Sequence, residues 1–380
     1  MNITWISKIE WNMPHKTSRL KMSEALIKRG NNVTLYMVKK FGEKIICPNN
    51  IICIPTIHLP ILSGFFYGLI IFFYFPILLK RKEIDYIIID GTKVMLPFII
   101  PIKILNKPII LDIRTLPIDK NESYPFKLSM FFCKYLIKGI TTITPELKNI
   151  LRDSYNIKKT KIGIWSSGVS IEDFEDIKID KNNFFFNKEN NHRFTLIYHG
   201  DYSPTRGIED LIRSIGKLEL SLKNKVRLLI VGMPQKKIEI LLKLIKDEGI
   251  NGHIHIVPKV SYKKIAQYIK ISDAGIIPLP PENKWWQVSA PLKTLEYLAS
   301  TKPIIATNIP FHNKIFNKGI CGILLKKGTP EAIAEGITNL YKNKNELKNM
   351  GEIGKQIVEK FYTWDAMASA FENFLKIIAN

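Results

Sequence analysis

The chain has 380 residues, more than one hydrophobic core usually holds, so we expect two domains. Hydrophobic residues make up 46% of the chain, a share that excludes an intrinsically disordered protein. The 56 Lys and Arg against 34 Asp and Glu give a net charge of +22, which favours anionic partners, although a general bias toward lysine would give the same excess.

Short apolar runs alternate with helical patterns through the first half of the chain. This alternation predicts a parallel sheet with helices on both faces. The predicted strands are 2–6, 33–38, 51–57, 84–90, 108–113, 140–144 and 161–164, and the predicted helices are 17–29, 61–82, 93–105, 125–138 and 146–153.

Residues 59–79 form an uncharged run that is followed by Lys80, Arg81 and Lys82. At about 1.5 Å per residue such a run is just long enough to cross a bilayer. Predicted strands flank it, however, and strands of one sheet cannot lie on opposite sides of a membrane. We therefore favour a helix that packs on the sheet and presents part of 59–82 to anionic lipid, with a fully buried helix and a true span as alternatives.

A charged, Asn-rich stretch at 171–193 predicts a linker between a domain at 1–170 and a domain at 194–363. The second domain repeats the alternation of strands and helices. Its predicted strands are 194–199, 226–231, 253–257, 273–278, 303–307 and 320–325, and its predicted helices are 208–219, 236–248, 261–270, 291–300, 330–342 and 345–361, followed by a last helix at 364–378.

The cysteines and the N-terminus bear on the compartment. Cys47, Cys53, Cys133 and Cys321 are not spaced as a metal or redox pair, so we expect a reducing, cytoplasmic setting. The first residues lack the charged-then-apolar pattern of a signal peptide.

Arg206 is the first candidate for anion binding. It directly precedes a predicted helix whose apolar stripe is Ile208, Leu211, Ile212 and Ile215. Free backbone N–H groups and the helix dipole favour an anion at such a position, and a guanidinium adds a fork that suits phosphate. An exposed arginine without a ligand is equally compatible with this pattern.

The stretch SAPLKTLEYLAS (289–300) predicts a helix capped by Ser289 or Ala290. Leu292, Leu295 and Ala299 share one face, and Glu296 falls on the same inward stripe. A buried carboxylate needs partners, and these are either ligand hydroxyls or a lysine. Lys293 lies in the first turn, where a cation is disfavoured unless it holds an anion.

These stretches occur in an order that resembles a known family. YHGDYSPTRGIEDLI (198–212), VRLLIVG (226–232), HIVPKVSYKKIAQYIKISDAGIIPLPP (255–281) and SAPLKTLEYLASTKPIIATNIP (289–310) are similar to the nucleotide-sugar domain of glycosyltransferase family 4, the retaining enzymes of GT-B fold. ILDIRTLP (110–117) and IGIWSSGVSIEDF (162–174) resemble parts of the partner domain. The resemblance implies an α/β protein with two doubly wound Rossmann-like domains that face a central cleft, with helix 364–380 packing back on the first domain.

The resemblance also implies roles for individual residues. Arg206 would hold the donor diphosphate, Glu296 the ribose hydroxyls, and Lys293 part of the diphosphate charge. From their place at the end of a predicted central strand, Asp112 and Arg114 are expected to face the acceptor, as is His15 in the first loop. Asp112 and Arg114 would either act with Arg206 and Lys293 at the reaction centre or only position other groups. The full implied donor set is Gly200, Arg206, Pro258, Lys259, Val260, Ser289, Ala290, Pro291, Leu292, Lys293 and Glu296.

Four departures from the family pattern affect the donor site more than the fold. Val288 stands where the family has the first acid of its two-acid motif, and Asp201 where many members have a second arginine. Ser167 replaces the common Asn before Gly168, and the first loop, SKIEWNMPHKTSR, lacks the usual glycine pair.

The function that this resemblance implies is transfer of a sugar, with retention, from a nucleoside diphosphate sugar to a glycan or lipid-linked acceptor. We expect no metal and no separate cofactor, and a peripheral position on the cytoplasmic face of the membrane, in surface polysaccharide or glycoconjugate synthesis. A sugar-nucleotide epimerase of the same fold is the alternative. A nucleic-acid-binding protein is a distant third, since no basic helix with interleaved aromatic residues is present.

Overall fold

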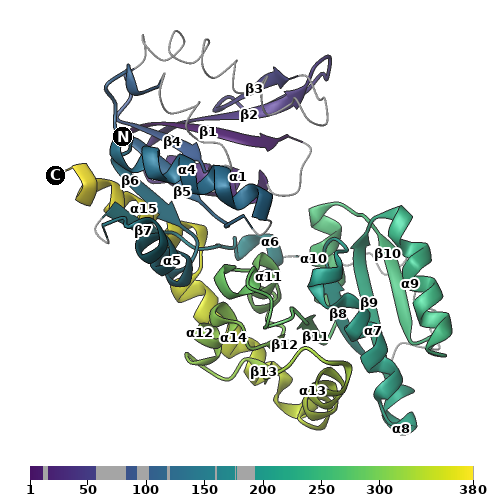
Figure 1. Ribbon diagram of the computed structural model, residues 1–380. Helices are drawn as coiled ribbons and strands as arrows, with labels where there is room; N and C mark the ends of the chain where they lie inside the picture. Colours follow the sequence, from purple (N-terminus) through teal and green to yellow (C-terminus); the bar gives the residue numbers. More distant parts are fainter. Residues whose placement is uncertain are drawn as a thin grey trace. The chain divides into compact units, whose positions relative to one another are not determined.

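A computed structural model of the chain describes residues 1–11, 16–56, 83–91, 102–117, 120–158, 161–175, 177 and 193–379. The chain divides into two compact units (Figure 1). The first comprises Met1–Ser167 and Trp364–Asn380, and the second comprises Gly168–Thr363. Most of the predicted linker, and most of the predicted helices 61–82 and 93–105, lie outside the described residues.

The first unit is built on a parallel sheet. Among its described residues, seven strands pair in the order β3-β2-β1-β4-β5-β6-β7. The five residues of β4 and the five of β5 are all buried, as expected for strands covered on both faces. The strands are β1 Asn2–Glu10, β2 Asn32–Lys40, β3 Ile51–Thr56, β4 Tyr86–Asp90, β5 Ile109–Ile113, β6 Gly139–Thr142 and β7 Ile162–Ile164, and the helices are α1 Thr17–Lys28, α4 Lys120–Leu136, α5 Pro145–Tyr155 and α15 Trp364–Ala379.

The second unit has the same design. Its described strands pair in parallel in the order β10-β9-β8-β11-β12-β13. The strands are β8 Phe194–His199, β9 Val226–Met233, β10 Ile254–Pro258, β11 Ala274–Ile277, β12 Ile304–Thr307 and β13 Gly322–Leu325, and the helices are α6 Glu172–Glu175, α7 Ile208–Lys217, α8 Leu220–Lys223, α9 Gln235–Asp247, α10 Tyr262–Ile271, α11 Leu292–Ala299, α12 Pro310–Phe316, α13 Pro330–Lys342 and α14 Leu347–Phe361.

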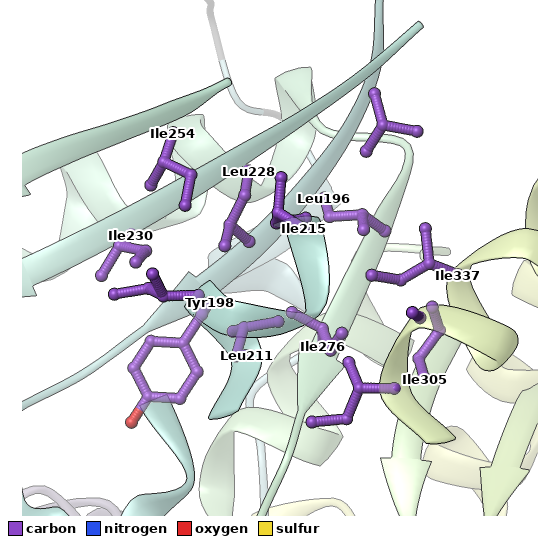
Figure 2. Packing of buried hydrophobic residues seen from close by; sticks show 14 of the residues in the cluster. Leu196, Tyr198, Leu211, Ile215, Leu228, Ile230, Ile254, Ile276, Ile305 and Ile337 are labelled. Carbon is purple, nitrogen blue, oxygen red and sulfur yellow. The ribbon is translucent and has the colours of Figure 1, made fainter. Parts of the chain in front are cut away.

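The core of the second unit follows from its apolar periodicity. The predicted stripe Ile208, Leu211, Ile212 and Ile215 is buried, which confirms its inward direction. Figure 2 shows Leu211 and Ile215 of α7 gathered with Leu196, Leu228 and Ile230 of the sheet in one cluster. This packing fixes the start of α7, and with it the turn that carries Arg206.

The C-terminal helix α15 belongs to the first unit, where Figure 1 shows it in yellow beside the strands of that unit. Phe371 is buried between Trp5 and Trp165, with ring centroids 6.1 and 6.3 Å away. The Tyr86 hydroxyl donates to the carbonyl of Leu375 at 2.9 Å. A side chain at Gly163 would overlap the ring of Phe374, so glycine there lets α15 approach β7 closely.

The expectation of reduced cysteines is wrong for one pair. A disulfide joins Cys47, in the loop after β2, to Cys53 of β3, a pairing that the spacing of the cysteines did not predict. Cys133 and Cys321 are free and buried. Within the described ranges no helix combines the length and the apolar character needed to cross a bilayer, and residues 59–82 lie outside those ranges.

Candidate donor site in the second unit

The strand order of the second sheet reverses between β8 and β11. In parallel α/β sheets, ligands bind beyond the carboxyl ends of the strands at such a reversal, because the two connections diverge there. Gly200 and the short turn Pro204–Arg206 follow β8, and α11 is the first α-helix after β11. Side chains from these segments are therefore the candidates for binding a ligand.

Arg206 ends that turn and stands directly before α7. Its Cζ lies 5.7 Å from the ring centroid of Trp286, whose Nε1 donates to the carbonyl of Thr205 at 2.7 Å. Gly207 follows with a φ of +68°, and a side chain there would overlap the carbonyl of Pro278. The backbone around the guanidinium is thus held on both sides, by Trp286 and by Pro278.

Lys293 lies in the first turn of α11, and its side chain is only 7% exposed. Its Nζ lies 4.0 Å from the ring centroid of Tyr198 and makes no hydrogen bond to any described residue. Burial lowers the pKa of Lys293 well below its usual value, the charge of Arg206 lowers the pKa further, and the charge of Glu296 opposes both effects. An anion bound beside Arg206 and Lys293 would offset both effects and favour the protonated form of Lys293, so these two residues suit an anionic ligand.

Gly200 keeps the space beside that ammonium open. It has a φ of +121°, and a side chain on it would approach within 3.2 Å of Lys293 Nζ. Its own N–H donates to the carbonyl of Val231 at 2.9 Å, which continues the pairing of β8 with β9.

Glu296 is buried on α11, as its place on the inward stripe predicts, with 6% exposed. Its Oε2 lies 3.1 Å from His199 Nε2 at the end of β8. The pKa of Tyr262, at the start of α10, is raised by burial and then by the negative charges of Glu296 and Asp173. The carboxylate is therefore surrounded by a histidine and a phenol, and not by the lysine considered from sequence.

Two details of α11 differ from the prediction. Every residue from Lys293 to Ala299 is buried, so the helix has no solvent-facing side. Pro291 is the N-cap, without a side-chain cap, while Ser289 Oγ donates to the carbonyl of Trp285 at 2.6 Å. Ala290 is buried beside this turn, and Leu292 is half-buried.

The segment Pro258–Val260 begins at the last residue of β10 and precedes α10, whose N-cap is Ser261. Pro258 and Lys259 are exposed and Val260 is half-buried. The loop is thus accessible beside Tyr262, which is consistent with a contact to a ligand and does not require one.

The acceptor-side candidates lie in the first unit. Asp112, at the end of β5, is completely buried; it accepts hydrogen bonds from Thr141 at 2.8 Å and Trp165 at 2.9 Å, and its Oδ2 lies 3.3 Å from Arg19. Arg114 donates to the carbonyl of Trp165 at 2.7 Å, and burial lowers its pKa to about 9. Both side chains hold the edge of the first sheet together, while His15 lies outside the described residues.

Comparison with known proteins gives the family. Residues 179–357 match the family model described as glycosyl transferases group 1. This range, just under half of the chain, is similar to the group 1 glycosyl transferases. The matched range holds Arg206, Lys293 and Glu296, so the candidate donor site lies within the part of the chain that the family model covers.

Relatives and solved structures agree with this assignment. The chain is 27% identical over 261 residues to an uncharacterized glycosyltransferase, MJ1069, of Methanocaldococcus jannaschii, covering 67% of this chain and less than two thirds, 64%, of that one. It is 26% identical over 321 residues to the capsular polysaccharide biosynthesis glycosyltransferase CapM of Staphylococcus aureus, covering 79% and 80%.

Two solved structures of low identity establish the fold. Sucrose-phosphate synthase from Thermosynechococcus elongatus matches with a TM-score of 0.79 at 14% identity over 99% of this chain and 98% of that one. The lipopolysaccharide glycosyltransferase WaaG matches with a TM-score of 0.71 at 14% identity, over 99% and 100%. The chain therefore has the GT-B fold, which confirms the fold predicted from the motif order.

Two of the positions that depart from the family pattern, Val288 and Asp201, place no charged group beside Lys293 in the structure. Val288 is buried, and Asp201 is exposed and accepts a hydrogen bond from its neighbour Tyr202 at 2.8 Å. Neither contributes a charge toward Lys293 that the structure records. Among the described residues, no group of His, Cys, Asp and Glu is arranged to hold a metal ion.

Sequence reasoning missed three side chains near the candidate donor site: His199, Tyr262 and His312. His312, on α12, bridges the carbonyl of Thr307 at 2.7 Å and Thr294 Oγ1, in the first turn of α11, at 3.0 Å. Since a carbonyl only accepts, Nδ1 carries the proton and Nε2 accepts from Thr294. The one signal in the sequence was that His199 ends a strand directly before Gly200.

Proposed function

We propose that this chain transfers a sugar, with retention, from a nucleoside diphosphate sugar to a glycan or lipid-linked acceptor. The single observation that carries the proposal is the buried Lys293 Nζ, which has no hydrogen-bonding partner among the described residues and feels the charge of Arg206. A ligand with two adjacent phosphates supplies the negative charge that this pair of cations lacks.

The residues suit the charge that develops during the reaction. When the bond between the sugar C1 and the diphosphate breaks, its electron pair goes to the leaving oxygen. Arg206 and Lys293 would stabilise that charge, which is where preorganised cations contribute most to rate. The acceptor hydroxyl forms the new bond to C1 on the same face, and its proton passes to the leaving phosphate.

Glu296 is proposed to take the ribose hydroxyls of the donor. A carboxylate can accept from both hydroxyls of a ribose, and the Glu296 carboxylate lies 3.1 Å from His199 Nε2. Solved structures of similar fold are described as complexes with UDP-glucose and with ADP and acarbose, so nucleotide donors are known on this fold.

We further propose that the acceptor belongs to a surface polysaccharide or a glycolipid, and that the chain works peripherally on the cytoplasmic face of the membrane through 59–82. CapM is named for capsular polysaccharide biosynthesis. A Mycobacterium tuberculosis relative, 20% identical over 185 residues, is named a phosphatidylinositol monomannoside mannosyltransferase that depends on GDP-mannose.

A donor panel tests the proposal. UDP-, GDP-, ADP- and dTDP-sugars are each added to the full chain, and the melting temperature is measured; a donor at 100 times its Kd stabilises by about 2.7 kcal/mol. The selected donor is then incubated with lipid extract, and the anomeric configuration of the product is read by NMR. Stabilisation by none of the donors, or an inverted product, contradicts the proposal; a free epimerised sugar nucleotide would indicate an epimerase instead.

A further inference from the structure

The outward face of α4 in the first unit is apolar. Tyr124, Leu128, Phe131, Phe132 and Tyr135 are between 44% and 72% exposed. At 3.6 residues per turn these five positions fall within an arc of about 100° on one side of the helix. A surface helix ordinarily carries charged and polar side chains on that side.

The opposite face of α4 is also apolar and packs on the first unit. Phe126, Met130 and Cys133 are buried, and the ring of Phe126 meets Tyr155 of α5 edge-on at 5.6 Å. An exposed apolar face on a folded domain marks a site of contact with protein or with a membrane. The described residues of the first unit cover one side of α4, and its aromatic side is exposed.

Lysines border the aromatic face. Lys127 and Lys138 are exposed, and Lys134 Nζ lies 4.9 Å from the ring centroid of Phe131 and 5.1 Å from that of Tyr135. The sequence from 124 to 138 contains no Asp or Glu. Side chains with an apolar body and a polar or cationic tip are the ones that gather where a bilayer meets water.

We propose that the aromatic face of α4 docks on an anionic lipid surface, with Phe131, Phe132 and Tyr135 at the boundary of headgroups and acyl chains. Lys127 and Lys134 would contact lipid phosphates. A second copy of the chain fits less well, because a symmetric contact through this face would oppose its lysines with no carboxylate from 124–138 between them. The inference rests on the membrane association proposed above and locates a second contact besides 59–82.

Vesicle sedimentation tests this surface. The full chain and a variant with F131Q, F132Q and Y135Q are spun with vesicles of phosphatidylcholine alone or mixed with phosphatidylglycerol. We expect the wild-type chain to bind mainly the anionic vesicles, and the α4 variant to bind at least tenfold less. A matched control, L220Q, I240Q and L242Q, replaces exposed apolar residues of the second unit and should bind like the wild-type chain.

Any other result of the sedimentation experiment contradicts a specific part of this inference. Equal sedimentation of the α4 variant removes α4 as the contact, and equal binding to neutral vesicles removes the role of the lysines. A chain that binds neither vesicle contradicts both this inference and the membrane part of the proposed function, while donor stabilisation still tests sugar transfer. A dimer that the α4 variant dissociates would assign the face to a second copy.

A second measurement avoids any dependence on the triple variant. A fluorophore that responds to polarity is attached at Y135C, in a chain whose other free cysteines, Cys133 and Cys321, are buried. Its emission should shift to the blue on anionic vesicles, whereas the same label at L242C should not shift. No difference between the two sites contradicts docking through α4.

Discussion

Lys293 is a buried ammonium that lacks a hydrogen-bonding partner among the described residues, so its replacement should affect stability and activity in opposite directions. We expect Lys293→Met to raise the free energy of unfolding of the ligand-free chain by about 0.5–2 kcal/mol. The same change should lower kcat by about 10²–10³, as loss of one group that stabilises developing charge does. Urea unfolding and initial rates measure the two effects.

The control for this prediction is Lys302→Met, at the other end of α11. Lys302 is also shielded from solvent, and burial lowers its pKa, but the carboxylate that opposes this shift is Asp273. Replacement of Lys302 should leave kcat within about twofold of the wild-type value, because substitutions away from the candidate donor site have small effects. Full activity of Lys293→Met would contradict the assignment of Lys293 to the donor site.

His312 predicts a pH dependence of stability. Burial lowers its pKa from 6.5 to about 4, so the folded state holds the ring neutral while the unfolded chain takes up a proton below pH 6.5. Stability should therefore fall as the pH drops from 6.5 to 4, by up to about 3 kcal/mol from this residue. Urea unfolding of His312→Gln should show a flatter profile in that window, and an unchanged slope would contradict the prediction.

Sequence identified the residues whose position depends on local helical periodicity, and it missed the residues that meet only through packing of distant segments. The inward direction of Glu296 follows from helical periodicity, which is local in the chain. The contact of Glu296 with His199 and Tyr262 depends on where α11 and α10 pack against the end of β8. The spacing of residues along the sequence does not determine that packing. The cluster of Arg19 with Asp90 and Asp112 was missed for the same reason, although both carboxylates end or nearly end adjacent apolar strands.

At the level of elements, α15 acts as part of the first unit although it follows the second in sequence. Phe371 lies between two buried tryptophans, so Phe371→Ala should lower the free energy of unfolding of the first unit by about 3–5 kcal/mol. Ile377→Ala, on the exposed side of the same helix, should cost less than about 0.5 kcal/mol. Equal effects of the two changes in chemical denaturation would mean that α15 does not hold the first unit together.

The elements that sequence predicted well are those with strong periodicity. Strands β8 and β9 are mostly apolar, and α7 shows one clear stripe. The seven-residue helix α12 was missed, because it is too short to show two repeats of a stripe and begins with Pro310, which equally suits a loop. His312 was missed with it.

At the scale of the whole molecule, the strand order of both sheets follows from general rules. Alternating strands and helices require parallel crossovers, and right-handed crossovers that start from the centre give the reversal beside β1 and β8. These rules predict that a ligand site can lie at the carboxyl edge of either sheet, but they do not predict which of the two edges binds the donor. The matched family range favours the second unit, and so does Lys293, whose Nζ has no hydrogen-bonding partner in the part of the chain that the structure describes.

Because the described donor candidates all lie in the second unit, the donor should stabilise that unit selectively. In calorimetry of the full chain, Phe371→Ala first identifies the thermal transition of the first unit, since only that transition should move down. The donor selected by the panel, at 100 times its Kd, should then raise the other transition by about 5–10 °C, from about 2.7 kcal/mol of linkage. Lys293→Met should reduce this shift, whereas Lys302→Met should retain it. A donor that raises the transition moved by Phe371→Ala would place the nucleotide on the first sheet, because a ligand stabilises the unit that holds it.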